Sequence, residues 1–196
     1  MRLPTLGEIA ELASLAQAGV HSPELMPFRV PWTDRAGEPR FFEDVVEPFH
    51  RGARENWRVE SWALLLAVWF EGQVIGAQDV RGEDFAARRS FETGSWLGQR
   101  FQGHGLGTEM RHGVLALGFA GLGARVAVSG AFEGNIASER VSEKLGYRAV
   151  GEAFYAPRGV PVREQIFALD RETWEAQDRP PVEIDGLEPC LALFGL

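Results

Sequence analysis

A glycine-rich segment in the middle of the chain could bind phosphate: Gln102-Gly103-His104-Gly105-Leu106-Gly107-Thr108. A strand-like segment precedes it, and a helix-like segment follows it. Glycine has no Cβ, so the backbone can approach an anion closely, and the first N–H groups of a helix have no partner within that helix. These groups and the helix dipole attract negative charge. The segment therefore predicts an anion-binding turn.

Two nucleotide-binding patterns fit this segment poorly. A mononucleotide-binding loop has a lysine between its last glycine and the following Ser or Thr, but here Thr108 follows Gly107 directly. A dinucleotide-binding turn has the pattern G-x-G-x-x-G and an acidic residue about 20 positions later. The spacing here is G-x-G-x-G, and no acidic residue ends a strand at that distance. Both patterns are disfavoured.

A known family fits better, because two further motifs flank the turn. Before it lies Glu92-Thr93-Gly94-Ser95-Trp96-Leu97-Gly98, and after it a helical pattern begins at Asn135 and ends in Leu145-Gly146-Tyr147. Gln102, Gly105 and Gly107 match the pattern Q/R-x-x-G-x-G/A. In this order the three segments resemble the GNAT superfamily of acyl-CoA-dependent N-acyltransferases. The first segment is similar to the RimJ/RimL-type branch, which acetylates protein N-termini.

The resemblance implies a fold and a cosubstrate. The expected fold is an α/β domain over residues 1–179, with a mixed, mostly antiparallel twisted sheet of about six to seven strands and helices on both faces. Acetyl-CoA is the expected cosubstrate, with no metal. Its implied binding residues are Trp96, Leu97, Gln102, Gly103, His104, Gly105, Leu106, Gly107, Thr108, Asn135 and Ser138.

The chemistry implied is direct attack of a primary amine on a thioester. The amine must lose a proton, because a free lysine has a pKa of about 10.4 and an α-amine one of about 8. Glu92 is the expected base, unless it is exposed or only forms a salt bridge. Many family members protonate the leaving thiolate with a tyrosine at the position that Ser142 occupies here. We therefore expect Ser138 to serve as the donor, although it could merely hydrogen-bond to backbone in the first helical turn.

The acceptor side is less defined by sequence. Residues 21–32 contain three prolines, which restrict the backbone around Phe28 and Trp32. These two aromatic residues are expected either to line the acceptor cleft or to pack onto the core. The acceptor itself is a protein N-terminus or a small-molecule amine. An antibiotic or polyamine acetyltransferase and a non-catalytic acyl-CoA-binding module remain as alternatives.

Apolar periodicity and glycines predict the elements that position these residues. The helix expected over 106–120 has an apolar stripe on one side and Glu109, Arg111 and His112 on the other. In the helix over 135–145, Asn135, Ser138 and Ser142 share a seam beside the apolar face. The other predicted helices are 6–18, 41–57 and 171–177, and the predicted strands are 62–70, 73–80, 90–98, 125–129, 147–153 and 164–169.

Composition limits the remaining possibilities. The chain has 196 residues. Its single cysteine excludes an internal disulfide, and its net charge of −8 disfavours nucleic-acid binding. No apolar run reaches the length of a membrane span and no signal pattern is present, so we expect a cytoplasmic protein. The tail, residues 180–196, is rich in large apolar side chains. We expect it to pack on its own domain or on the partner in a homodimer.

Overall fold

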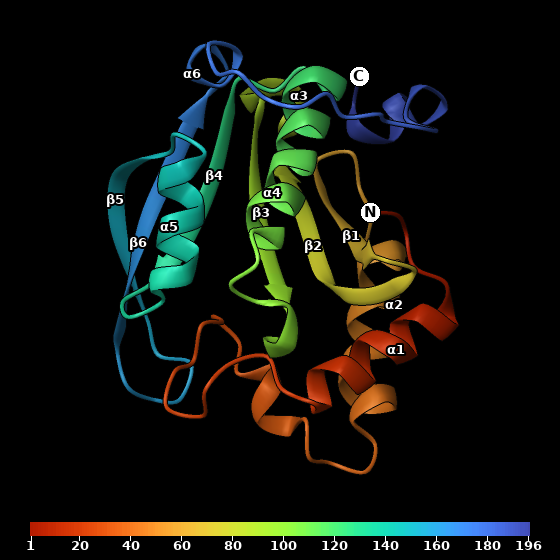
Figure 1. The fold of residues 1–196 in the computed structure, drawn as a ribbon. Coiled ribbons are helices and arrows are strands. Elements are labelled where there is room, and N and C mark those ends of the chain that lie inside the picture. The colour runs from red at the N-terminus through yellow and green to blue at the C-terminus, as the bar shows by residue number, and fades with distance from the viewer.

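The computed structural model describes residues 1–196 and contains one six-stranded sheet with the order β1-β2-β3-β4-β6-β5 (Figure 1). Only the β3–β4 pair is parallel. The sheet is therefore mixed and mostly antiparallel, and the predicted α/β fold is confirmed. Its strands are β1 (Ser61–Phe70), β2 (Gln73–Glu83), β3 (Ser90–Leu97), β4 (Val126–Phe132), β5 (Arg148–Tyr155) and β6 (Val162–Asp170).

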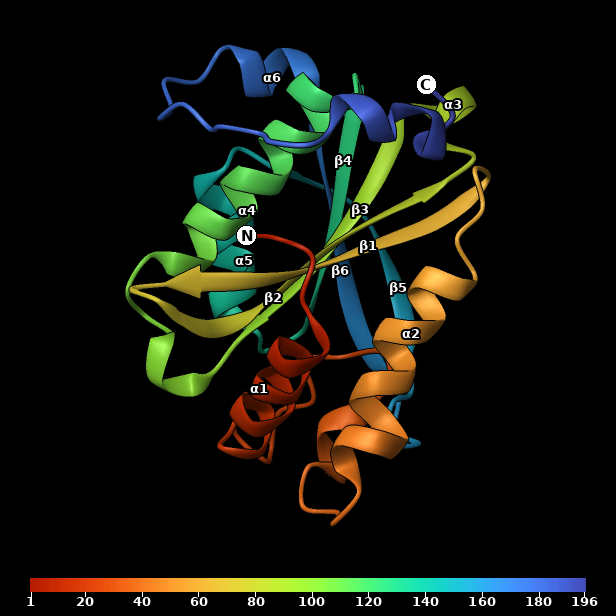
Figure 2. The same ribbon diagram turned by 90° about the vertical axis from the view of Figure 1, so that its right-hand side faces the viewer.

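Helices cover both faces of the twisted sheet (Figures 1 and 2). On one face α1 (Leu6–Gln17) packs against β1 and β2, and α2 (Glu47–Glu55) packs against β1. On the other face α4 (Leu106–Ala116) packs against β2 and β3, and α5 (Ile136–Lys144) packs against β4 and α4. No helix combines the length and apolar character that a membrane span requires.

Several element boundaries differ from the sequence prediction. The helix expected over 41–57 is a π-helical turn, Phe42–Val46, followed by α2. The helix expected over 106–120 changes from α4 to a π-helical turn at Leu117–Gly121. Within this turn an added Cβ at Gly118 would overlap the ring of Phe91, so glycine permits close packing on β3. Two further α-helices are short: α6 (Arg171–Glu175) and α3 (Phe85–Arg88), which was not predicted.

The tail forms a 3-10 helix at Glu188–Phe194 that contacts the start of the sheet. Phe194 is buried against Trp57 and Trp62, with ring centroids 5.3 Å and 4.9 Å away. The indole Nε1 of Trp57 donates a hydrogen bond to the Leu193 carbonyl at 2.9 Å. The tail thus packs on apolar residues of its own chain.

The sheet splits between its two parallel strands. β3 and β4 pair only at Ser90–Glu92 with Val126–Val128, although both strands continue beyond this point. Past the split, β3 remains paired with β2, and β4 remains paired with β6. The two halves of the sheet therefore diverge and leave space between β3 and β4.

Candidate functional site

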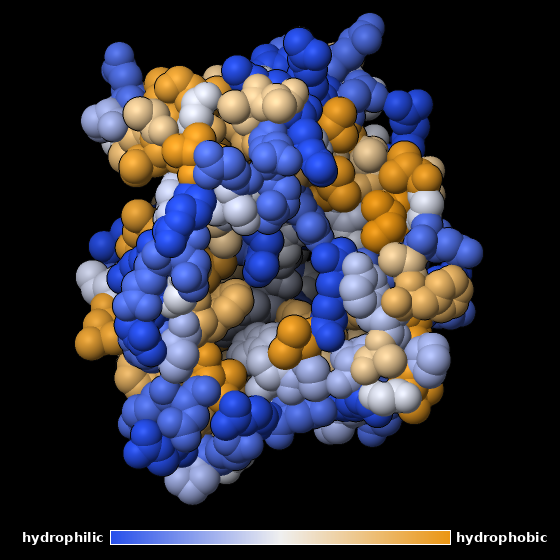
Figure 3. Space-filling view, turned by 180° about the vertical axis from the view of Figure 1, so that it is seen from behind, coloured by the Kyte–Doolittle hydropathy of each residue, from blue (hydrophilic) through white to orange (hydrophobic).

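A cavity of about 950 Å³ occupies the region of the split. Gly107 of α4 and Ser138 of α5 line it on one face of the sheet, and Phe49 and His50 of α2 line it on the other. The back of the molecule is visibly hollowed at its centre (Figure 3). Since residues from both faces line this one cavity, two ligands could enter from opposite faces and meet within it.

The glycine-rich turn has the properties of an anion site. Gly103 and Gly105 have φ values of 81° and 85°, which strongly favour glycine. An added Cβ at either position would meet no atom within 4 Å. The N–H groups of residues 103–107 donate no backbone hydrogen bond, so consecutive donors are left without a backbone partner. This arrangement fits the phosphates of a nucleotide-like cosubstrate.

Gln102 holds this turn in place. Its Nε2 donates to the carbonyl of Val20 at 2.7 Å and to that of Leu97 at 2.8 Å, linking the turn to the residues after α1 and to the end of β3. The implied cosubstrate residues divide into two groups. Those that line the cavity are Trp96, Leu97, Gln102, Gly107, Asn135 and Ser138, and those that lie outside its lining are Gly103, His104, Gly105, Leu106 and Thr108.

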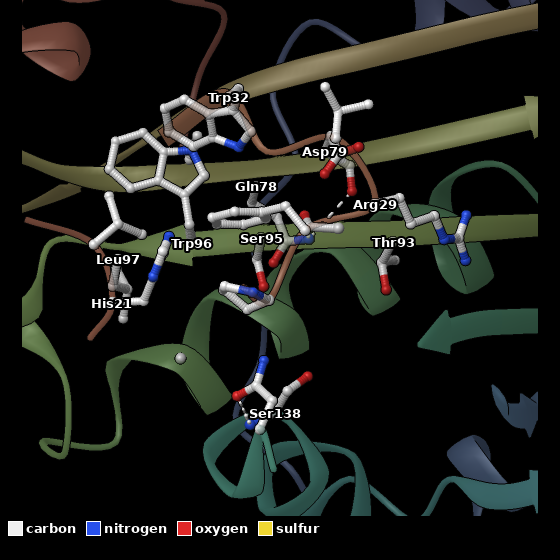
Figure 4. A pocket seen from close by; sticks show the side chains of 18 of the residues that line it. His21, Arg29, Trp32, Gln78, Asp79, Thr93, Ser95, Trp96, Leu97 and Ser138 are labelled. Carbon is white, nitrogen blue, oxygen red and sulfur yellow. Dashed lines mark hydrogen bonds between the residues drawn. The ribbon is translucent and has the colours of Figure 1, made fainter. Parts of the chain in front are cut away.

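The start of α5 places one hydroxyl in the cavity. Asn135 caps the helix, and its Oδ1 accepts a hydrogen bond from the Ser138 N–H at 3.3 Å. Ser138 lies across the cavity from Ser95 of β3 (Figure 4). Ser142, by contrast, is fully buried, its hydroxyl has no partner, and it does not line the cavity. The predicted seam of polar residues therefore reaches the cavity at Asn135 and Ser138 but not at Ser142, because α5 packs there against α4 and β4.

Two carboxylates share one guanidinium on the opposite side of the cavity. Arg29 Nη1 lies 2.9 Å from Glu92 Oε1, and Arg29 Nη2 donates to Glu164 at 2.8 Å. Burial opposes the charge of Arg29, but the hydrogen bonds to Glu164 and the charge of Glu92 outweigh it and raise its pKa. The cluster carries one excess negative charge. It also ties the proline-rich loop to β3 and β6.

The aromatic residues of the proline-rich loop both line the cavity and pack against the core. Phe28 and Trp32 line the cavity, with their ring centroids 5.3 Å apart. Trp32 also stacks on the buried Phe41 at 6.1 Å and contacts Trp96 of β3 at 5.6 Å. The cavity wall is therefore continuous here with the apolar core around Phe41.

The prediction for Arg111 was wrong. It was placed on the solvent side of its helix, but only 3% of its surface is exposed. Its Nη1 donates to Ser129 Oγ at 2.7 Å and its Nη2 to Ser95 Oγ at 3.2 Å. The sheet covers α4 on one side and α5 covers it on another, so the buried arc is wider than the apolar stripe. Leu115 lies four residues after Arg111, on the same side of the helix, and is also buried. An apolar residue at this spacing is the sequence signal that could have indicated the wider buried arc.

Sequence reasoning also missed Gln78 of β2. This side chain is fully buried and lines the cavity. Its Nε2 donates to the carbonyl of Gly94 at 2.7 Å, whereas its Oε1 has no hydrogen-bond partner. A buried acceptor without a partner is costly, so this side chain is an unsatisfied polar group beside the cavity.

The burial of His50 leads us to expect that the free energy of unfolding of the protein depends on pH. Burial, and to a smaller extent the charge of Arg54, lowers its pKa from 6.5 to about 4. Between these values the unfolded chain binds more protons, so the free energy of unfolding falls as pH falls from 6.5 to 4. A shift of this size corresponds to about 3 kcal/mol. In urea unfolding at pH 7 and pH 4.5, His50→Gln should lose less stability than wild type, and the exposed-site variant His104→Gln should behave as wild type. Equal losses in all three proteins would contradict the prediction.

Comparison with known proteins places this geometry in context. A family model described as an acetyltransferase (GNAT) domain matches residues 1–148. Among solved structures, Mycobacterium smegmatis RimJ in complex with CoA-disulfide is similar, with a TM-score of 0.70 and 16% identity over 87% of this chain and 81% of that one.

Two further solved structures share the fold. The microcin self-immunity acetyltransferase MccE, in complex with acetyl-CoA and AMP, has a TM-score of 0.65 and 18% identity over 86% of this chain and 89% of that one. A chimera of the Vibrio cholerae spermidine N-acetyltransferase SpeG and hSSAT has a TM-score of 0.67 and 14% identity over 90% of this chain and 98% of that one. At these identities the likeness concerns the fold alone.

Proposed function

Because the chain belongs to the acetyltransferase (GNAT) domain family and is an acyl-CoA-dependent acetyltransferase, we propose that it acetylates the primary amine of a protein N-terminus or a small molecule. One observation carries this proposal. The cavity extends from Gly107, at the end of the glycine-rich segment, through the split sheet to the acidic cluster around Arg29. It therefore gives the acyl donor and the amine separate approaches to one point.

On the donor side, the free N–H groups of residues 103–107 would hold the phosphates of CoA. Leu97 and Gly107 would border the rest of the molecule. Bound acetyl-CoA supplies a thioester: the amine nitrogen bonds to its carbonyl carbon, the carbon–sulfur bond breaks, the nitrogen loses a proton and the thiolate gains one. Ser138 Oγ makes no hydrogen bond within the chain, so it is free to donate to the thiolate.

On the acceptor side, two features favour an amine. The cluster of Arg29, Glu92 and Glu164 carries excess negative charge, which attracts an ammonium group. Trp32 and the neighbouring Phe28 offer an apolar wall. A polyamine is the second candidate acceptor, since the same excess negative charge would attract a polycation.

A thiol-release assay tests the proposal. Purified protein with acetyl-CoA is offered peptides with free N-termini, their N-acetylated counterparts, spermidine and an aminoglycoside. We expect thiol release with at least one free amine and none with the blocked peptides. CoA binding without release from any amine would instead indicate a non-catalytic acyl-CoA-binding module.

Ser138→Ala should lower kcat about tenfold or more while changing the Kd of acetyl-CoA little. The reason is that a hydrogen bond to a charged group contributes about 1.5–3 kcal/mol, and this bond would form only with the departing thiolate. Ser142→Ala is a matched control on the same helix. Its hydroxyl is buried and unpartnered, so its removal should leave turnover unchanged. Wild-type turnover in Ser138→Ala would assign the proton donor to water or another group.

Glu92→Gln should reduce kcat/KM about a hundredfold, and most strongly at the acidic end of the pH–rate profile. At lower pH more of the amine is protonated, so a base contributes most there. Glu92 is 40% exposed, so its carboxylate is accessible to accept a proton. The exposed Glu60 provides a control variant, Glu60→Gln. If the profiles of Glu92→Gln and wild type coincide, Glu92 only forms the salt bridge.

A further inference from the structure

Arg111 is a buried charge without a counter-charge. Three charged residues are buried: Glu8 and Glu164, which pair with Arg2 and Arg29, and Arg111, which forms no ion pair. A guanidinium stays protonated in proteins, and removing its charge from water is unfavourable unless an anion compensates. The fold alone leaves this charge uncompensated.

The neighbours of Arg111 do not neutralise it. The Tyr147 hydroxyl lies nearby, but burial raises its pKa more than the charge of Arg111 lowers it, so the phenol stays neutral. Ser95 and Ser129 accept hydrogen bonds from Arg111 but carry no charge. The Arg111 Nε is buried and has no partner at all. At least one donor of the guanidinium is therefore unused.

The position of Arg111 connects this charge to the cavity. Arg111 lines the cavity, and its two serine partners lie on β3 and β4, on either side of the split. Ser95 is exposed in the cavity, and because its oxygen accepts from Arg111, its O–H is free to donate to a ligand. A ligand in the split would thus meet a hydroxyl donor supported by a permanent positive charge.

We propose that Ser95 and Arg111, the latter held in place by Ser129, form an anion-binding site for a negatively charged group at the acyl end of the donor thioester. The proposal rests on the proposed use of an acyl-CoA in this cavity. Two sources of negative charge share this chemistry. One is a carboxylate at the end of a longer acyl chain, as in succinyl-CoA. The other is the charge that develops on the carbonyl oxygen as the amine nitrogen bonds to the carbonyl carbon, before the thiolate leaves.

Binding and turnover of the whole protein test the site and separate the two sources. Calorimetry without acceptor compares acetyl-CoA, succinyl-CoA and butyryl-CoA, the last matching succinyl-CoA in chain length but lacking its charge. For a carboxylate, wild type should bind succinyl-CoA about tenfold tighter than butyryl-CoA, and Arg111→Met should abolish this difference. For a developing charge, Arg111→Met should lower kcat with acetyl-CoA about tenfold and leave the Kd of acetyl-CoA within about twofold.

Two further variants guard against a folding artefact. Ser95→Ala keeps the buried charge of Arg111. It should produce part of the loss that Arg111→Met causes, either in the preference for succinyl-CoA or in kcat. Arg111→Met combined with Ser129→Ala removes the acceptor that Arg111→Met alone leaves buried and unpartnered. An anion site predicts that this double variant melts at the wild-type temperature or above, because an uncompensated buried charge has been replaced by an apolar side chain.

The proposal is overturned if wild type binds succinyl-CoA and butyryl-CoA equally and Arg111→Met keeps wild-type turnover. It is also overturned if wild type binds succinyl-CoA and butyryl-CoA equally and acetylates no amine. A succinyl-CoA preference that depends on Arg111, in a protein that transfers no acyl group, would support the anion site and refute the proposed transferase function. The two failures are therefore distinguishable.

Discussion

Gly107→Glu is expected to lower the affinity for CoA about a hundredfold or more. Gly107 lies where α4 approaches Leu97 of β3 and Val141 of α5, and it lines the cavity. A glutamate there would introduce a negative charge beside the turn that is proposed to hold the phosphates. Like charges about 4 Å apart near a protein surface repel by about 4 kcal/mol, and 1.4 kcal/mol corresponds to a tenfold change in affinity.

Two substitutions at the same position separate charge from bulk. An alanine Cβ at Gly107 would lie 3.6 Å from Val141 Cγ2 and 3.9 Å from Leu97 Cδ1, which are ordinary contacts. Gly107→Ala should therefore bind CoA nearly as wild type does, and Gly107→Gln should lose less affinity than Gly107→Glu. A glutamate in the first helical turn suits the helix dipole, so the variant should fold. Wild-type CoA affinity in folded Gly107→Glu, measured by calorimetry, would refute the placement of the phosphates.

Phe194→Ala is expected to reduce the free energy of unfolding by about 3–5 kcal/mol, a typical loss for truncating a buried phenylalanine. Phe194 is only 4% exposed and meets the rings of Trp57 and Trp62 edge-on. We propose on this basis that residues 180–196 are an extension packed on the domain formed by residues 1–179. Urea unfolding followed by tryptophan fluorescence measures the loss.

The neighbouring residue supplies the control. Leu193 is 53% exposed in the same helical turn, so Leu193→Ala should change stability by no more than about 0.5 kcal/mol. Light scattering on wild type and Phe194→Ala tests the homodimer alternative. Equal stability of Phe194→Ala and Leu193→Ala, or a mass that halves in Phe194→Ala, would show that the tail is not a necessary part of the domain core.

Local sequence signals determined much of this protein. The turn with Gly103 and Gly105 was predictable because only glycine readily adopts its positive φ values. Asn135 was predictable as the start of a helix because asparagine caps helices well. Most strands and helices followed from apolar periodicity, and the order of three motifs indicated the family. Each of these signals lies within a few consecutive residues.

Tertiary structure decided the features that bring distant segments together. Arg29 reaches Glu164 across 135 residues of sequence, so no local pattern could have indicated this contact. The split sheet depends on where β3 and β4 stop pairing, which neither strand specifies alone. Arg111 was misplaced because periodicity assumes one buried side per helix, whereas α4 is covered by both the sheet and α5. Burial of a charged side chain is a property of everything packed around it, and its own sequence neighbourhood does not contain that information.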